Sequence, residues 1–182
     1  SWEDWLTFAA ALVSFIAVAV SIQESDWVPG MPAVVPTMIA GLAAGFVAAR
    51  VRFGFGLVQL AALGFGIVVV ALTVQSFADG TNIADRLADT RLRLVDWFHV
   101  VRANEISNDR LPFVAIVQSV CFLSAYLAAF AIYRWHNPWI AILPGGVVLL
   151  ANVALARGNT TPPLVIFLFG AMLLIARLHL QR

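Results

Sequence analysis

Charged residues are concentrated in one stretch near the middle of the chain, and long apolar runs lie on both sides of it. Residues 79–111 hold six of the ten acidic residues and five of the eleven basic residues. The segments before and after this stretch are almost continuously apolar. We therefore expect two hydrophobic halves joined by one polar segment that lies in water.

The apolar runs have the length of membrane-spanning helices. A bilayer core about 30 Å thick needs roughly 20 apolar residues in a helix. Six runs fit this requirement, at about residues 6–22, 31–49, 53–77, 112–133, 138–156 and 163–180. The pattern predicts an all-α polytopic membrane protein with about six transmembrane helices, three on each side of the polar segment. Neither half has the pattern of a soluble core, so residues 1–182 are predicted to form a single integral membrane domain.

The polar segment has a helical period of its own between about residues 82 and 103. Its apolar residues recur at helical spacing and form one stripe, made of Ile83, Leu87, Leu94, Phe98 and Val101. Such a helix is too charged to span a membrane, so we expect it to lie along the membrane surface or to cap the bundle. On its other face, Asp89 and Arg93 are spaced for an i,i+4 ion pair. The candidate surface for contact with a partner consists of Asp85, Asp89, Arg93 and Asp96.

Glycines in the second and third runs indicate close packing of helices. Gly41 and Gly45 form a small-xxx-small pattern, which lets a second helix approach closely. Gly54 and Gly64 suggest further close helix contacts in the third run. Two interpretations remain open for the Gly41–Gly45 pair: a dimerisation face, or packing against another span of the same chain.

Arginines in short loops predict the orientation of the chain, because cytoplasmic loops carry an excess of positive charge. One side receives Arg50, Arg52, Arg134, Arg177 and Arg182, whereas the short loops of the other side hold only Arg157. Both ends of this chain are therefore predicted to be cytoplasmic, and the amphipathic helix is predicted to be non-cytoplasmic.

The composition agrees with lipid as the main solvent. Hydrophobic residues make up 62% of the chain and charged residues only 12%, with a mean hydropathy of +0.91. Soluble domains are about 45–50% apolar and about 25% charged. The basic residues are scattered, with no run that could follow a phosphate backbone, so nucleic-acid binding is not expected.

Candidate chemistry is sparse. No ionisable residue lies near the centre of a predicted span, and the polar residues there, Asn152 among them, are interpreted as hydrogen-bonding between helices. The lone Cys121 is predicted to be a packing residue in an apolar span. The three histidines fall at predicted membrane interfaces rather than facing one another. The sequence therefore predicts no catalytic residue, no cofactor and no metal site.

Six segments resemble the N-terminal membrane region of bacterial transglutaminase-like (TgpA-like) membrane proteins. They are residues 2–7 (WEDWLT), 84–89 (ADRLAD), 106–109 (ISND), 133–139 (YRWHNPW), 144–152 (PGGVVLLAN) and 174–182 (LIARLHLQR). The resemblance implies a bacterial inner-membrane location and a papain-like Cys-His-Asp domain that follows the membrane region outside the cytoplasm. No residue of this chain matches that triad, so the chain is expected to be the anchor or scaffold and not the enzyme. With Arg182 inside, one more span would precede an external domain.

Two other functions remain as alternatives. The chain can be an accessory subunit of a larger bacterial membrane complex, with its Gly-rich faces and amphipathic helix contacting other membrane subunits. A mature polypeptide ending near Arg182 would favour this alternative. A small transporter is the third interpretation, and it requires a water-accessible cavity near Pro144 and Asn152. The Pro144–Gly145–Gly146 sequence can either break its helix or produce a kink.

Overall fold

Every regular element that the computed structural model describes is helical, which confirms the predicted all-α class. The structure describes residues 2–51, 54–105, 107–155 and 161–180. Its α-helices are α1 (Trp2–Glu24), α2 (Val35–Arg50), α3 (Phe55–Val74), α4 (Ile83–Arg102), α5 (Leu111–Phe130), α6 (Pro138–Leu155) and α7 (Thr161–Leu180). A short 3-10 helix η1 (Gln75–Phe77) extends α3, and a π-helical turn η2 (Ala131–Trp135) extends α5.

Five helices of the described chain are long and apolar enough to cross a membrane. They are α1, α3 with η1, α5 with η2, α6 and α7. The sixth predicted span, at 31–49, corresponds to α2, which has 16 residues and is roughly 24 Å long at the usual helical rise. It begins at Val35 rather than at Met31, because a proline disfavours helical backbone in the residue before it, and Pro32 follows Met31. Pro36 is accommodated in the first turn of α2.

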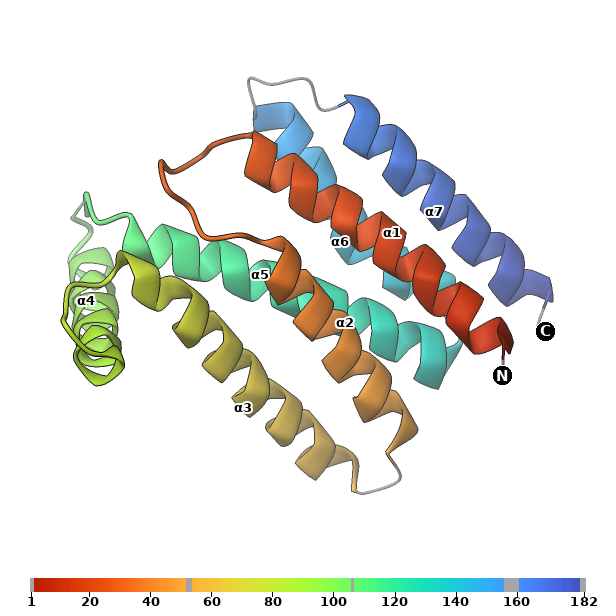
Figure 1. Cartoon of the computed structure of the whole chain (residues 1–182), viewed down its shortest axis with the longest axis horizontal. Coiled ribbons are helices and arrows are strands. Elements are labelled where there is room, and N and C mark those ends of the chain that lie inside the picture. Colours follow the sequence, from red (N-terminus) through yellow and green to blue (C-terminus); the bar gives the residue numbers. More distant parts are fainter. Residues whose placement is uncertain (1, 52–53, 106, 156–160, 181–182) are drawn as a thin grey trace.

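The helices pack in two connected groups. In the centre α2 lies along α5, and α3 covers the side of this pair, whereas α1 lies along α7 with α6 behind it (Figure 1). One large core cluster joins the groups, and Phe15, Met38 and Leu149 are among its fully buried side chains. By contrast, α3 and α6 keep most of their apolar surface exposed. The outer surfaces of the bundle are therefore available to lipid.

Gly41 and Gly45 pack against α5 within the same chain. A Cβ at Gly41 would lie 2.5 Å from the carbonyl oxygen of Phe122, and one at Gly45 would lie 2.3 Å from that of Tyr126. Both distances are far below van der Waals contact, so only glycine allows the two backbones to approach this closely. Of the two interpretations of this pair, the internal one is observed here.

The prediction that Gly54 and Gly64 are helix-packing positions is not met within the described chain. A Cβ at either position would meet no other atom within 4 Å. Both residues face away from the neighbouring helices, because α3 turns Gly66 and Ala62 toward them instead. Gly66 lies against the ring of Phe122, where a Cβ would come within 2.5 Å of the ring edge. The packing glycine of α3 is therefore Gly66.

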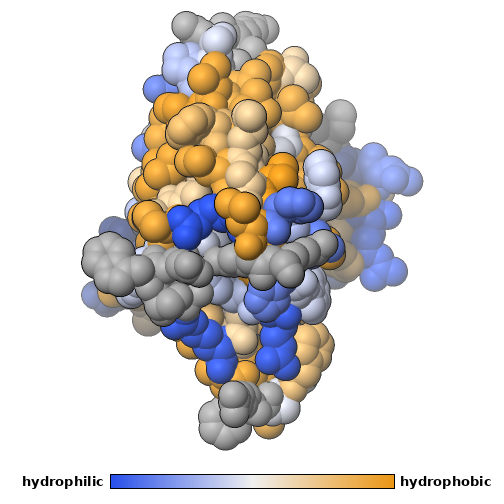
Figure 2. All heavy atoms as spheres, turned by 90° about the vertical axis from the view of Figure 1, so that its right-hand side faces the viewer, coloured by the Kyte–Doolittle hydropathy of each residue, from blue (hydrophilic) through white to orange (hydrophobic). Residues whose placement is uncertain are grey.

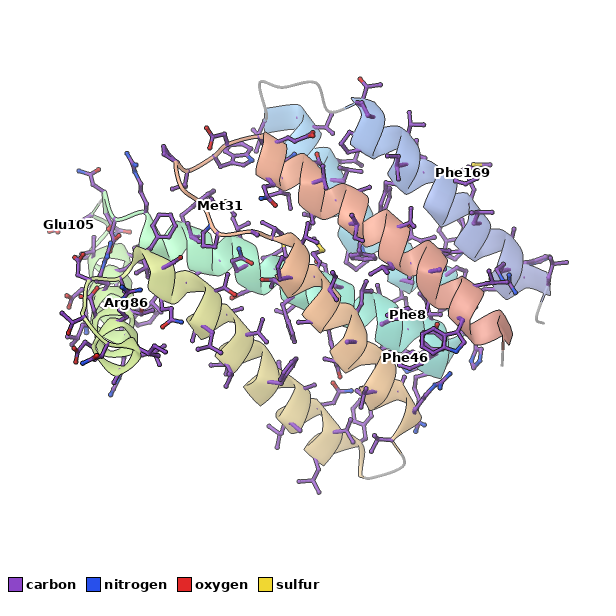
Figure 3. The ribbon with its side chains drawn as sticks, in the orientation of Figure 1. Phe8, Met31, Phe46, Arg86, Glu105 and Phe169 are labelled. Atoms are coloured by element: carbon purple, nitrogen blue, oxygen red, sulfur yellow. The ribbon has the colours of Figure 1, made fainter. Side chains whose placement is uncertain are left out.

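The two chain ends lie at one end of the bundle, and α4 lies at the other (Figure 1). In Figure 1 the helix α4 is strongly foreshortened, whereas the other helices lie in the plane of the picture. The axis of α4 therefore crosses the axes of the other helices. Figure 2 looks onto the end with the termini, where hydrophilic side chains lie between hydrophobic surfaces above and below. Phe8 and Phe46 lie together near this end (Figure 3), with ring centroids 5.4 Å apart. The guanidinium carbon of Arg50 lies 4.1 Å from the Phe46 ring centroid, as in a cation–π contact.

Candidate functional site

The helix α4 begins and ends as its sequence predicts. Asn82 has the extended backbone of a helix N-cap, and Asp85 lies in the first turn, where the helix dipole favours negative charge. Arg102 lies in the last turn, where positive charge is favoured. The Asn82 side chain makes no capping hydrogen bond, and the Thr81 hydroxyl donates instead to the Asp85 carboxylate at 3.2 Å. The predicted amphipathic helix at 82–103 is thus confirmed as α4.

Arg93 fastens the middle of α4 to the segments on either side of it. Its Nε donates to a carboxylate oxygen of Asp109 at 2.7 Å, and its Nη2 donates to the other oxygen of the same carboxylate. Its Nη1 donates to the backbone carbonyl of Phe77 at 2.9 Å. Paired hydrogen bonds between a guanidinium and a carboxylate are among the strongest that proteins form. One side chain therefore joins α4 to the end of η1 and to the segment before α5.

The charges of this pair stabilise each other. The Arg93 guanidinium, helped by the backbone N–H groups of Leu111 and Arg110, holds the pKa of the Asp109 carboxyl below its usual range. The hydrogen bond to Asp109 in turn raises the pKa of Arg93. Partial burial opposes both shifts without reversing them. Arg93 and Asp109 therefore remain an ion pair at neutral pH.

Two further contacts hold the start of α4 against the turn that precedes it. The backbone N–H of Asp79 donates to the Asp89 carboxylate at 3.1 Å. Arg86 donates from Nε to the carbonyl of Gly80 at 3.0 Å. The predicted Asp89–Arg93 pair is also present, with Nη1 and Oδ2 3.7 Å apart. The orientation of α4 is thus fixed along much of its length by polar contacts.

The structure separates the four predicted partner-contact residues into two pairs. Asp85 and Asp96 are exposed on a flank of α4 that faces away from the bundle. Asp89 and Arg93 are partly buried and take part in the contacts just described. Only Asp85 and Asp96 therefore keep their carboxylates directed toward solvent, while Asp89 and Arg93 position the helix.

The apolar stripe also differs from the predicted one. Leu87 and Leu94 turn toward the bundle, but Ile83, Phe98 and Val101 remain exposed. The residues missed by the sequence analysis are Thr90, which is 5% exposed, and Trp97, which is half-buried. Their spacing in the sequence could have identified them. Thr90 is three residues after Leu87, and Trp97 is three residues after Leu94, so all four side chains share one face of the helix.

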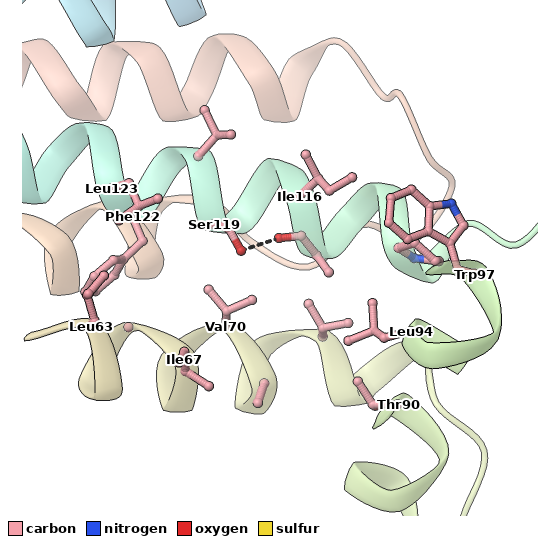
Figure 4. A pocket seen from close by; sticks show the side chains of 16 residues that line it. Leu63, Ile67, Val70, Thr90, Leu94, Trp97, Ile116, Ser119, Phe122 and Leu123 are labelled. Atoms are coloured by element: carbon pink, nitrogen blue, oxygen red, sulfur yellow. Dashed lines mark hydrogen bonds between the residues drawn. The ribbon is translucent and has the colours of Figure 1, made fainter. Parts of the chain in front are cut away.

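A crevice lies beneath α4, between α3 and α5. Its volume is about 470 Å³. Thr90, Leu94 and Trp97 of α4 close one end, while Ile67 and Val70 of α3 face Ile116 and Ser119 of α5 (Figure 4). The crevice is almost wholly apolar. The hydroxyls on its wall donate to their own helices, Thr90 to the carbonyl of Arg86 at 2.8 Å and Ser119 to that of Ala115 at 2.7 Å.

Asn152, near the C-terminal end of α6, joins this helix to α1 and to the loop after α1, and it also lies on the wall of a mostly apolar pocket of about 260 Å³. The Asn152 amide donates to the carbonyl and hydroxyl of Ser21 and to the hydroxyl of Ser25, at 2.8–2.9 Å. Its oxygen accepts from the indole N–H of Trp27 at 2.7 Å. Pro144 lies inside a continuous α6, so its helix is not broken. These contacts agree with the interpretation of Asn152 as a link between helices.

No cluster suited to metal binding occurs among the described residues. No three histidine, cysteine, aspartate or glutamate side chains gather there in a way that could hold a metal ion. Cys121 is buried in α5 and takes part in the main apolar cluster. The distinctive arrangement of the described chain is therefore α4, its polar attachment and the crevice below it.

Comparisons with known proteins give no relative. No protein-family model, no curated protein and no solved structure matches this chain, so its function has to be argued from the all-α, multi-pass membrane bundle and from α4.

Proposed function

We propose that this chain is a non-catalytic membrane scaffold of the bacterial inner membrane, and that it anchors and orients a transglutaminase-like domain outside the cytoplasm. The observation that carries the proposal is the fixed position of α4 across the end of the bundle opposite both chain ends. A helix that only covered the bundle would need no ordered polar attachment, but Arg93 joins α4 to two separate segments. Such a helix can hold a partner in one orientation.

The charge distribution supports an outer position for α4. Arg50 ends α2, Arg134 lies in η2 and Arg177 lies in the last turn of α7, and these three elements end where the chain ends lie. Positive charge in short loops favours the cytoplasmic side. On this basis α4 is outside the cytoplasm, on the side where a transglutaminase-like domain would be after one more span. The exposed carboxylates of Asp85 and Asp96 are then the contact points for such a domain.

The test begins with the native polypeptide in its own cells. Its intact mass is measured first, and a mature chain ending near Arg182 would remove the catalytic-domain proposal. In the native full-length protein, a photoreactive phenylalanine analogue is then placed at Asp96, with a matched control at Gly54 at the other end of the bundle. We expect position 96, and not position 54, to crosslink to the domain beyond Arg182. Crosslinks from position 54 alone would contradict the proposal.

An accessory subunit of a larger membrane complex is the second candidate, and the surface of α3 favours it. This helix leaves most of its apolar residues exposed, and Gly54 and Gly64 face open space. Small residues on an open face are what a neighbouring membrane helix needs for close approach. Under this alternative, Gly64→Leu would release the chain from a complex that survives mild detergent. The intact mass of the native polypeptide distinguishes it from the first proposal.

A further inference from the structure

We propose that the crevice between α3, α4 and α5 is a binding site for a membrane phospholipid. One acyl chain lies in the crevice, and the phosphate is held by Arg91. This inference needs only the membrane-embedded bundle and the position of α4. It is independent of which domain or subunit α4 contacts.

The chemistry of the crevice wall selects a hydrocarbon. Its side chains are almost all apolar, and the hydroxyls of Thr90 and Ser119 are already bonded to backbone carbonyls of their own helices. A polar ligand would therefore lose its hydrogen bonds to water and gain none along these walls, which is unfavourable. A hydrocarbon chain makes no hydrogen bonds to water, so it loses none when it enters the crevice.

The size of the crevice suits a single lipid chain. It holds about 470 Å³, which lies in the range of small-molecule pockets, about 300–1,000 Å³. A single flexible acyl chain is the occupant that the surrounding solvent supplies at high concentration.

A second hollow lies next to the crevice and has an exposed cation on its wall. It has a volume of about 360 Å³ and shares the wall residues Ala71, Thr90 and Leu94 with the crevice. Arg91 lies on its wall and is exposed. The guanidinium of Arg91 makes no ion pair or hydrogen bond with any residue that the structure describes. It is therefore available to a phosphate at the level of α4.

The flanks of α4 differ in charge in the way that a lipid surface requires. Asp85, Asp89 and Asp96 follow spacings of four and seven residues, which place them on one flank. Arg91 and Arg102 are eleven residues apart, about three turns, and lie on the flank that contains Phe98. Cations beside an apolar stripe suit an interfacial helix whose basic side chains reach lipid phosphates. The hollow opens on this basic flank and not on the acidic one.

Trp97 provides an additional polar group at the closed end of the crevice. It is half-buried on the crevice wall, and its indole N–H bonds to no other residue of the described chain. Tryptophan is enriched at membrane interfaces because its ring is apolar and its N–H is polar. The Trp97 ring is therefore suited to a position at the membrane interface, at the end of the crevice (Figure 4).

The test uses the native full-length protein in nanodiscs of phosphatidylcholine that contain a little phosphatidylglycerol with a diazirine in the middle of one acyl chain. After illumination, mass spectrometry locates the crosslinks. We expect enrichment on Val70 and Ser119, which are partly buried on the crevice wall, relative to the open lipid face of α7 at Phe169, which points away from the bundle (Figure 3). Excess phosphatidylglycerol should remove the enrichment, whereas equal amounts of diacylglycerol or glycerol phosphate should not.

Matched variants separate the two parts of the site. Arg91→Gln should lower crevice crosslinking about five-fold, the effect expected for one arginine near anionic lipid, whereas Arg102→Gln on the same flank should not. Ala71→Phe fills the shared wall and should lower crosslinking about ten-fold or more. Gly64→Phe adds the same ring to α3 where nothing lies within 4 Å and should have no effect.

Three results would overturn the proposal. The first is an even spread of crosslinks over the whole lipid-facing surface, including that of α7. The second is an equal loss with Arg91→Gln and Arg102→Gln, which would indicate a general attraction between the helix and the membrane surface. The third is crosslinking of crevice residues to a second copy of this chain instead of to lipid.

Discussion

The guanidinium of Arg93 is bonded to both carboxylate oxygens of Asp109, a residue sixteen positions further along the chain. The same carboxylate accepts the backbone N–H of Leu111, the first residue of α5, at 3.0 Å. Asp109 therefore fixes two elements at once: it holds α4 through Arg93 and it sets the start of α5. Because α5 is the most centrally packed helix of the bundle, this pair ties the surface helix directly to the core.

Arg93→Gln should loosen α4 without unfolding the bundle. A neutral amide cannot form the paired charged hydrogen bonds with Asp109, and such bonds contribute about 1.5–3 kcal/mol each in favourable cases. We expect hydrogen exchange in α4 to become faster while exchange in α2 and α5 is unchanged. Arg102→Gln is the matched control, because this substitution also removes one positive charge from α4 but leaves the bond between Arg93 and Asp109 intact. Equal rates of hydrogen exchange in α4 in the two variants would show that the Arg93–Asp109 pair does not hold this helix in place.

The attachment should depend on pH with a defined sign. The pKa of Asp109 is lowered in the folded protein, chiefly by Arg93. A lowered pKa contributes stability above the ordinary carboxyl value, about 3.9, that is lost as the pH falls through the folded value. Arg93 stays charged throughout, because its own pKa is raised. The attachment is therefore constant from pH 5 to 8 and weakens below about pH 4.

Spin labels on α4 at Asp96 and on α5 at Phe113 can measure this effect. Their distance distribution should be narrow at neutral pH and broad in strong acid. In Asp109→Asn it should be broad at every pH, because the titrating group is absent. A distribution that broadened in acid to the same extent in Asp109→Asn would assign the pH dependence to other groups.

Replacing Gly45 with leucine should separate α2 from α5. A Cβ added at Gly45 would lie 2.9 Å from the Cβ of Ala129 and would also press against the backbone carbonyl of Tyr126. Backbone atoms cannot move aside at low energetic cost. We expect a loss of stability of about 1–3 kcal/mol or more, as for overpacked cores, visible as a lower unfolding temperature in detergent. Gly64→Leu makes the same change on α3 where space is open, so its unfolding temperature should stay near that of the unchanged protein.

Asn152→Leu should weaken the contact between α1 and α6. The substitution leaves the Trp27 N–H without its acceptor and removes the donors to Ser21 and Ser25. Hydrogen bonds between membrane helices contribute about 0.6–2 kcal/mol, and the unfolding free energy in detergent should fall by about that amount. Val147→Asn, at an exposed position on the same helix, serves as the control for polarity. An unchanged unfolding free energy in Asn152→Leu would mean that water takes over the hydrogen bonds that Asn152 makes.

Helix positions could be predicted from the sequence because apolar length and charge are local properties. The ends of the predicted spans agree with the helices to within four residues, and the largest differences are at the starts of α1 and α2. At α2 the apolar run begins at Met31 but the helix begins at Val35, because Pro32 disfavours helical backbone in the residue before it. Local backbone chemistry thus limited a prediction made from hydropathy.

Contacts between distant residues could not be predicted in the same way. The i,i+4 spacing of Asp89 and Arg93 was readable, but the bond from Arg93 to Asp109 depends on the path of the segment between α4 and α5. The roles of Gly64 and Gly66 likewise depend on the rotation of α3 about its axis. In the structure Gly66 faces the ring of Phe122 and Gly64 faces open space, although both glycines lie in the same apolar run.

The central claim is that α4 lies outside the membrane on the side opposite both ends of this chain, and labelling of single cysteines tests it most directly. Asp96→Cys is placed on α4 and Gly54→Cys at the opposite end of the bundle, each in the full-length protein with Cys121 replaced by serine. In intact cells, a membrane-impermeant maleimide should label position 96 from outside and position 54 only after permeabilisation. Labelling of position 54 from outside, with position 96 protected until the cells are opened, would contradict the account.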